Sequence, residues 1–104
     1  MSVADDFEHQ PVMRDEIVDV FSTVPPGVVL DATLGGGGHT EAILESRADL
    51  RVLGIDRDHT ALKAAGARLE RFGERFAAAH ARFDALREVM DDHEVAELSG
   101  ALFD

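Results

Sequence analysis

Residues 28–40 read Val-Val-Leu-Asp-Ala-Thr-Leu-Gly-Gly-Gly-Gly-His-Thr, and this stretch decides the fold. Its first part, residues 28–33, is short, apolar and rich in β-branched side chains, which is typical of a buried strand. Four consecutive glycines follow, and residues 39–46 then read as a helix. A strand that passes through glycines directly into a helix is the opening unit of a parallel α/β sheet.

The chain on either side of this stretch continues the alternation of strands and helices. Further strands are predicted by apolar runs at 51–55, 76–81 and 99–104. Helices are predicted at 12–24, 58–72 and 84–93. Pro25-Pro26-Gly27 ends the first helix, and Asp58 can serve as the N-cap of a later one. We therefore expect a parallel sheet of about four strands with helices on both faces.

Length and composition exclude several classes of protein. The chain has 104 residues, which suits one small domain, and no cysteine, which rules out disulfides and thiolate metal sites. The five histidines lack the spacing of metal ligands, so no metal site is expected. No signal peptide or apolar run of roughly 20 residues is present, so a cytoplasmic protein without a membrane span is expected.

The net charge of the chain limits the partners that it can bind. The formal net charge is -11, which by itself argues against binding a phosphate backbone through this segment.

Residues 1–8 are expected to form a flexible tail, and residues 9–104 part of one domain. Because the sequence stops on Asp104 at the end of a predicted strand, we expect a truncated domain: active-site groups of such sheets lie at strand ends.

Two features at strand ends predict a nucleoside site. Glycines at 35–38 allow positive φ and close approach of a ligand, and the helix that follows offers free N–H groups at its positive end. Asp56 ends the next strand, 21 positions after Gly35. An acid at that separation in α/β folds accepts hydrogen bonds from ribose hydroxyls.

The loop sequence narrows the choice of nucleoside ligand. The third glycine of a dinucleotide fingerprint that starts at Gly35 falls on Thr40, and the Lys-Ser/Thr pair of a Walker loop is absent after Gly38. The acid before the loop, Asp31, fits S-adenosylmethionine better than a pyrophosphate. The residues therefore favour a methyltransferase over a nicotinamide-dependent dehydrogenase. Phe83, after the third predicted strand, is expected from spacing to be a core residue, with stacking on adenine as the alternative.

Three motifs together resemble one known family. His9-Gln10-Pro11-Val12-Met13, the stretch 31–40 and Gly54-Ile55-Asp56-Arg57-Asp58 are similar to the successive signatures of the 16S ribosomal RNA cytosine-N4 methyltransferases, the RsmH or MraW family. The resemblance runs from about His9 to Asp104. It implies a Rossmann-like class I methyltransferase fold, S-adenosylmethionine as cofactor and N4-methylation of a cytidine in 16S ribosomal RNA.

The resemblance also implies roles for particular residues. The cofactor contacts it carries over are Gly37, Gly38, His39, Asp56, Phe83 and Asp104. Asp104 matches the aspartate that opens the family's Asp-Leu-Gly-Val-Ser-Ser segment and is the one candidate for a catalytic group, as acceptor for the target amine. The rest of that segment, a later glutamine and a helical insertion implicated in RNA binding are absent, and Leu98-Ser99-Gly100-Ala101 replaces the usual Val-Asp-Gly-Ile.

Two alternatives stay open at this point. One is a fragment of an NAD-dependent dehydrogenase, against which Thr40 counts. The other is a degenerate chain without catalytic function; an open reading frame continuing into Leu-Gly-Val-Ser-Ser after codon 104 would argue against it. The fragment is expected to be inactive alone, because most RNA contacts would come from the missing part.

Overall fold

The computed structural model describes residues 14–103. The tail predicted for residues 1–8, the turn at 9–11, the start of the first predicted helix and Asp104 lie outside these residues. The elements in chain order are a helix at 14–20, the 3-10 helix η1 (Phe21–Thr23), β1 (Gly27–Asp31), α2 (Gly38–Ser46), β2 (Leu50–Asp56), α3 (His59–Leu69), the 3-10 helix η2 (Glu70–Arg75), β3 (Phe76–His80), the 3-10 helix η3 (Phe83–Ala85), α4 (Leu86–Asp92) and β4 (Gly100–Leu102).

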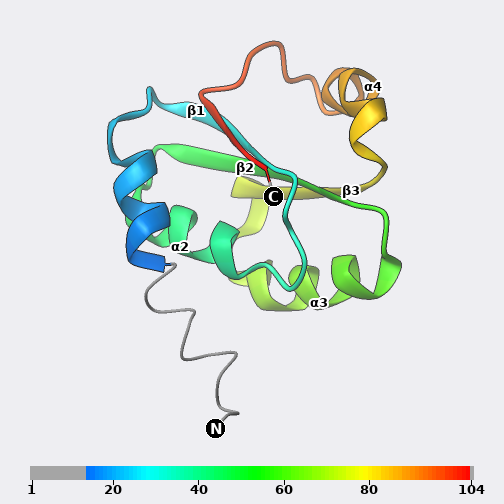
Figure 1. Ribbon diagram of the computed structural model, residues 1–104, viewed down its shortest axis with the longest axis horizontal. Helices are drawn as coiled ribbons and strands as arrows, with labels where there is room; N and C mark the ends of the chain where they lie inside the picture. The colour runs from blue at the N-terminus through cyan, green and yellow to red at the C-terminus, as the bar shows by residue number, and fades with distance from the viewer. Residues whose placement is uncertain (1–13, 104) are drawn as a thin grey trace, which may run out of the picture.

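All four strands are parallel and lie in the order β3-β2-β1-β4. The carboxyl ends of the two central strands lie near one another, because Asp31 of β1 pairs with Gly54 of β2. The helix at 14–20, α2 and α3 lie on one side of the sheet, and α4 lies on the other (Figure 1). The predicted three-layer α/β arrangement is therefore confirmed.

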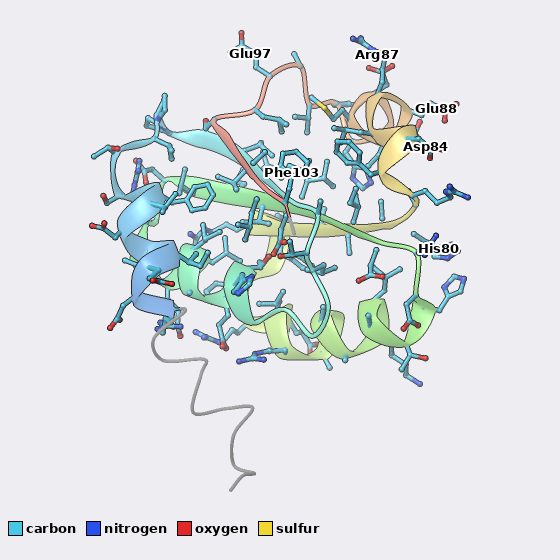
Figure 2. The ribbon with its side chains drawn as sticks, in the orientation of Figure 1. His80, Asp84, Arg87, Glu88, Glu97 and Phe103 are labelled. Carbon is cyan, nitrogen blue, oxygen red and sulfur yellow. The ribbon has the colours of Figure 1, made fainter. Side chains whose placement is uncertain are left out.

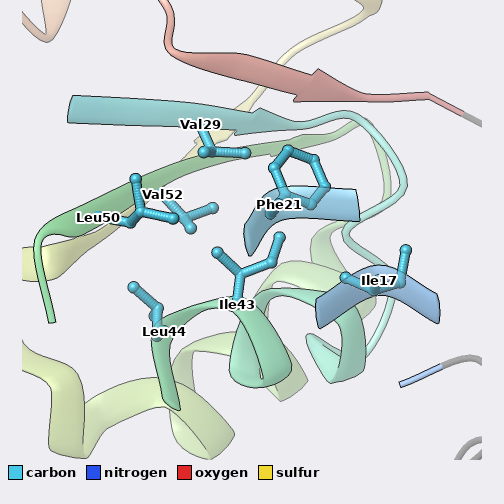
Figure 3. Close-up of a cluster of buried hydrophobic side chains, with 7 residues drawn as sticks. All are labelled: Ile17, Phe21, Val29, Ile43, Leu44, Leu50 and Val52. Carbon is cyan, nitrogen blue, oxygen red and sulfur yellow. The ribbon is translucent and has the colours of Figure 1, made fainter. Parts of the chain in front are cut away.

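Each face of the sheet has its own apolar cluster, because successive strand residues point to opposite sides. Figure 3 shows the cluster on the α2 side, which consists of Ile17, Phe21, Val29, Ile43, Leu44, Leu50 and Val52. The cluster on the α4 side is built on Leu30, Leu53, Ile55 and Val89. Val29 and Leu30 are adjacent in β1 and both fully buried, so the central strand is covered from both sides.

Arginine side chains connect the helices on the α2 side of the sheet through ion pairs and hydrogen bonds. Arg68 and Arg71 of the α3–η2 segment pair with Glu41 of α2, and Arg71 also pairs with Glu45. Arg75 donates to the backbone carbonyls of Leu44, Arg47 and Leu50 and so satisfies groups at the end of α2 and the start of β2. These bonds fix how α2 sits against the segment that leads into β3.

The element bounds differ slightly from those predicted. The third strand is present at Phe76–His80, one residue shorter than predicted, and pairs with β2. The fourth strand is shorter than predicted and spans Gly100–Leu102. The helix predicted from Asp84 begins with the 3-10 turn η3, since a regular α-helix starts only at Leu86.

Candidate functional site

The strand order creates a switch point at the carboxyl end of the sheet. The chain moves from β1 to β2 and β3 on one side, then returns to place β4 against the other side of β1. Loops that leave neighbouring strands in opposite directions leave a crevice between them, which is where open α/β sheets bind ligands. The loop at 32–37 and Phe103 follow strands at this end, and Asp56 is the last residue of β2.

The glycine loop contains two glycines required by the backbone and two that are not. Gly35 has φ of 46° and Gly37 φ of 92°, both in the left-handed region that favours glycine. A Cβ on Gly37 would also lie 3.1 Å from Leu69 Cδ1. Gly36 and Gly38 have no positive φ; a Cβ would meet nothing within 4 Å at Gly36 and only the Arg68 guanidinium, 3.7 Å away, at Gly38. The described residues therefore give no steric reason for glycine at 36 and 38, which leaves the backbone open to a ligand.

Asp31, the last residue of β1, fixes the glycine loop through hydrogen bonds. Its carboxylate is fully buried and accepts three hydrogen bonds. Oδ1 accepts from the Thr33 N–H at 2.8 Å and the Thr33 hydroxyl at 2.7 Å, and Oδ2 accepts from the Thr40 hydroxyl at 2.6 Å. These bonds offset the cost of burying the charge and tie β1, the loop and α2 together. Thr40 thus has a structural reason to stand where a dinucleotide fingerprint has glycine.

Asp56 links the end of β2 to the glycine loop. Its Oδ2 accepts from the Gly35 N–H at 3.2 Å, and its Oδ1 accepts from the Asp58 N–H at 2.9 Å. Each carboxylate oxygen can accept two hydrogen bonds, so one acceptor position remains on each. The half-buried carboxylate is therefore equipped to bind two neighbouring hydroxyls at once.

The two helices that leave this end of the sheet begin differently. Asp58 caps α3 as predicted, since its side chain accepts from the Thr60 N–H at 2.9 Å. The N-cap of α2 is Gly37, whose position offers no side-chain cap. The first N–H groups of α2 lack intrahelical partners by geometry and are suited to a carboxylate or other anionic group.

A cavity of about 430 Å³ lies beside the loop. It is lined by Ala32, Ile55, Asp56, Arg57, Ala81, Arg82, Phe83 and Asp84. Phe83 is 53% exposed, so the expectation that it belongs to the core is wrong. Its ring packs edge-to-face on Phe103 with centroids 5.1 Å apart. Phe83 follows β3 and Phe103 follows β4, so the pair joins loops from the two edges of the sheet; Figure 2 shows Phe103 at the end of β4, with Asp84 toward α4.

Most of the residues predicted for the site lie at this end of the sheet. Gly37, Gly38 and His39 form the turn from the loop into α2, and Asp56 is hydrogen-bonded to that loop through Gly35. Phe83 lines the same cavity as Asp56. Asp104 lies outside the described residues. The hydrogen bonds that Thr33 makes could not be predicted from residue spacing. The one indication in the sequence was Asp31, because a carboxylate at the end of a buried strand needs hydrogen-bond donors around it.

Within residues 14–103, no group of three or more acidic, histidine or cysteine side chains is placed to hold a metal ion. The helices of that same range are all too short or too polar to cross a bilayer.

The fold is that of the Rossmann-like methyltransferases. A superposition with an rRNA methylase from Streptococcus thermophilus gives a TM-score of 0.63 at 24% identity, covering 88% of this chain and 51% of that one. An S-adenosylmethionine-dependent O-methyltransferase from Thermotoga maritima gives 0.59 at 16% identity, covering 69% of this chain and 28% of that one. At such identities the likeness concerns the fold alone.

Sequence comparison defines the family. The chain belongs to the MraW methylase family, whose sequence profile matches residues 6–104. It is 49% identical over 100 residues to the ribosomal RNA small subunit methyltransferase H of Kocuria rhizophila. That match covers 92% of this chain and 30% of the relative, so the chain spans about a third of the relative's length.

Proposed function

We propose that this chain forms the cofactor-binding part of an S-adenosylmethionine-dependent methyltransferase that acts on small-subunit ribosomal RNA. The observation that carries the proposal is the hydrogen bond between Gly35 and Asp56, which joins the glycine loop to a carboxylate with two free acceptor positions. A nucleoside with an amino-acid end has groups that fit both parts. Membership of the MraW methylase family supports the same assignment.

Each of the site residues would bind a different part of the cofactor. Asp56 would accept from the two ribose hydroxyls, and Phe83 would stack on the adenine in the adjoining cavity. The N–H groups of the Gly37–His39 turn would receive the carboxylate of the amino-acid end. The buried charge of Asp31 beneath the loop favours a ligand with a cationic part over a pyrophosphate. This distribution argues against the dehydrogenase alternative.

When bound, S-adenosylmethionine supplies a methyl group on a sulfonium, ready for in-line transfer. We propose that the acceptor is the exocyclic N4 of a cytidine in 16S ribosomal RNA, as the family resemblance implies. The lone pair of this nitrogen is delocalised into the ring, which makes the amine a poor nucleophile. The protein must therefore orient the amine, accept hydrogen bonds from its N–H groups and exclude water. Asp104 is proposed as that acceptor. The target base would have to leave its stack in the RNA to reach the site. An rRNA substrate also implies a cytoplasmic location for the protein.

Calorimetric titration tests the cofactor site. S-adenosylmethionine and NAD are titrated separately into the chain and into its Asp56→Asn and Asp58→Asn variants. Asp58→Asn is the matched control, because asparagine keeps the N-cap function while the site carboxylate is untouched. Saturable binding of S-adenosylmethionine that is lost only in Asp56→Asn is expected. Binding of NAD in preference, or equal losses in both variants, would refute the assignment.

The transfer itself is tested in a chain of the relative's full length. Residues 1–104 can be joined to the rest of the Kocuria rhizophila relative and supplied with S-adenosylmethionine and unmodified small ribosomal subunits. Mass spectrometry of the nucleosides is expected to detect N4-methylcytidine, at a rate reduced by Asp104→Asn. Methylation of another atom, or normal turnover in Asp104→Asn, would contradict the proposed substrate atom or the proposed role of Asp104.

A further inference from the structure

We propose that Asp31 and Thr33 act as positioning residues that fix the tautomer of His39 with its proton on Nδ1, leaving Nε2 as a hydrogen-bond acceptor. The inference gives Thr33 a role that the cofactor assignment does not use, and it adds a specific contact route to the general charge effect of Asp31. It starts from a chain of contacts at the base of the glycine loop. Thr33 Oγ1 lies 2.7 Å from Asp31 Oδ1 and 3.2 Å from His39 Nδ1.

The direction of these bonds follows from the number of protons available. A threonine hydroxyl has one proton to donate, and an ionised carboxylate can only accept. At 2.7 Å from Asp31 Oδ1, two oxygens without a proton between them would repel, so the Thr33 hydroxyl donates to Asp31. Thr33 Oγ1 can then only accept from His39, and Nδ1 must carry the proton.

The arrangement is rigid enough to hold this choice. Asp31 is fully buried, and its other oxygen accepts from the Thr40 hydroxyl, so the carboxylate cannot turn away from Thr33 without leaving a buried donor unpaired. Its Oδ1 also accepts from the Thr33 backbone N–H, which fixes the position of the residue that carries the hydroxyl. A histidine whose Nδ1–H is engaged presents its second nitrogen as a neutral acceptor.

The consequence for the cofactor rests on the proposed function. Nε2 of His39 makes no hydrogen bond to another side chain or backbone group among residues 14–103, and His39 is the second residue of α2, beside Gly37 and Gly38. The amino-acid end of S-adenosylmethionine carries an ammonium group, which donates only. We therefore infer that the ammonium donates to Nε2, with the charge of Asp31 supporting it through Thr33.

Nuclear magnetic resonance of the imidazole nitrogens tests the tautomer without any ligand. Long-range ¹H–¹⁵N correlations are recorded at about pH 8.5, where an ordinary imidazole is neutral, and a His39→Gln variant assigns the signals. His80 is an internal reference of opposite type, because its Nε2 lies 2.9 Å from the Arg57 carbonyl and must be the protonated nitrogen. His39 is expected to show the Nδ1–H pattern, and an Nε2–H pattern in the unmodified chain would overturn the proposal.

Three variants separate positioning from general damage to the fold. Thr33→Val removes the hydroxyl and is expected to shift His39 toward the Nε2–H form, while Thr33→Ser is expected to restore Nδ1–H. Thr40→Val removes a different donor to Asp31 and is expected to lower stability without changing the tautomer of His39. An unchanged His80 pattern reports that each variant is folded. Retention of Nδ1–H in folded Thr33→Val would overturn the proposal.

Ligand titrations then separate this inference from the proposed function. S-adenosylhomocysteine is compared with its deaminated analogue, which keeps the carboxylate and lacks the ammonium. Thr33→Val is expected to weaken binding of the first by about tenfold, the loss of one hydrogen bond to a charged group, and to leave the second unchanged. Equal weakening of both would refute the ammonium contact. If neither ligand binds the unmodified chain, the cofactor function and the ammonium contact fail together, and the tautomer is still decided by the ligand-free spectra.

Discussion

Replacing Gly37 by alanine is expected to destabilise the chain by about 2–3 kcal/mol, whereas the same change at Gly38 costs nothing. The φ of 92° at Gly37 is left-handed, and an L-residue there costs roughly 1–2 kcal/mol. The added Cβ would lie 3.1 Å from Leu69 Cδ1 in a buried cluster, which adds about 1 kcal/mol of overpacking. For a domain of this size, about 2–3 kcal/mol corresponds to a fall in melting temperature of about 8–24 °C.

Gly38 provides the matched control for this prediction. It is the first residue of α2, and a Cβ there would make an ordinary contact of 3.7 Å with the Arg68 guanidinium. Alanine forms helix better than glycine, by up to about 1 kcal/mol, so the melting temperature should stay or rise. If the glycine serves close approach of the cofactor, Gly38→Ala should nevertheless weaken S-adenosylhomocysteine binding by about tenfold or more.

Thermal unfolding followed by circular dichroism, with calorimetric binding on the same samples, measures both quantities. Equal losses of melting temperature in the two variants would refute the division into structural and ligand-facing glycines. Undiminished binding by Gly38→Ala would refute the role assigned to that position.

Further substitutions test the packing of Gly54, the ion pairs of Glu45 and the exposure of the Phe83 ring. Gly54→Ala would bring a Cβ to 2.7 Å from Leu34 Cδ1 and should cost about 1–3 kcal/mol in chemical denaturation, whereas Gly66→Ala, in open space on α3, should stabilise by up to about 1 kcal/mol; similar effects of the two would contradict the packing described. Hydrogen bonds from Arg71 and Arg14 lower the pKa of Glu45, so its stabilising effect is present above about pH 4.5 and lost as pH falls through the lowered value. The melting temperature of the unmodified chain should therefore exceed that of Glu45→Gln at pH 7 and converge with it as the pH falls below the lowered pKa of Glu45, and a constant difference would count against these ion pairs. Phe83→Ala should leave the melting temperature almost unchanged, because the ring is 53% exposed, but weaken S-adenosylhomocysteine binding by about tenfold through lost stacking; a large fall in stability would show that the ring has a core role after all.

The sequence was sufficient to predict what depends on local pattern. Apolar runs bounded by glycine and proline located the strands, and the spacing between Gly35 and Asp56 placed a glycine loop beside a carboxylate, which the hydrogen bond between them confirms. The N-cap at Asp58 follows from side-chain chemistry within a few residues of chain and was also predicted correctly.

Features that depend on distant contacts could not be predicted in this way. Phe83 follows a strand at one edge of the sheet and meets Phe103 from the opposite edge, and nothing in the spacing reveals that meeting or the exposure of both rings. Gly54 lies in the middle of a strand because Leu34 of the loop needs the space, a requirement visible only once the two segments are packed together. The bonds that Asp31 makes with Thr33 and Thr40 likewise require the folded loop.

The backbone amide resonances of the chain report directly where S-adenosylhomocysteine binds. We expect saturable shifts that centre on Gly35–His39, Asp56–Arg57 and Ala81–Asp84, with no comparable response to NAD at the same concentrations. Shifts that centre elsewhere, such as the amino ends of the strands, or a stronger response to NAD, would contradict the assignment of this loop and carboxylate as a site for S-adenosylmethionine.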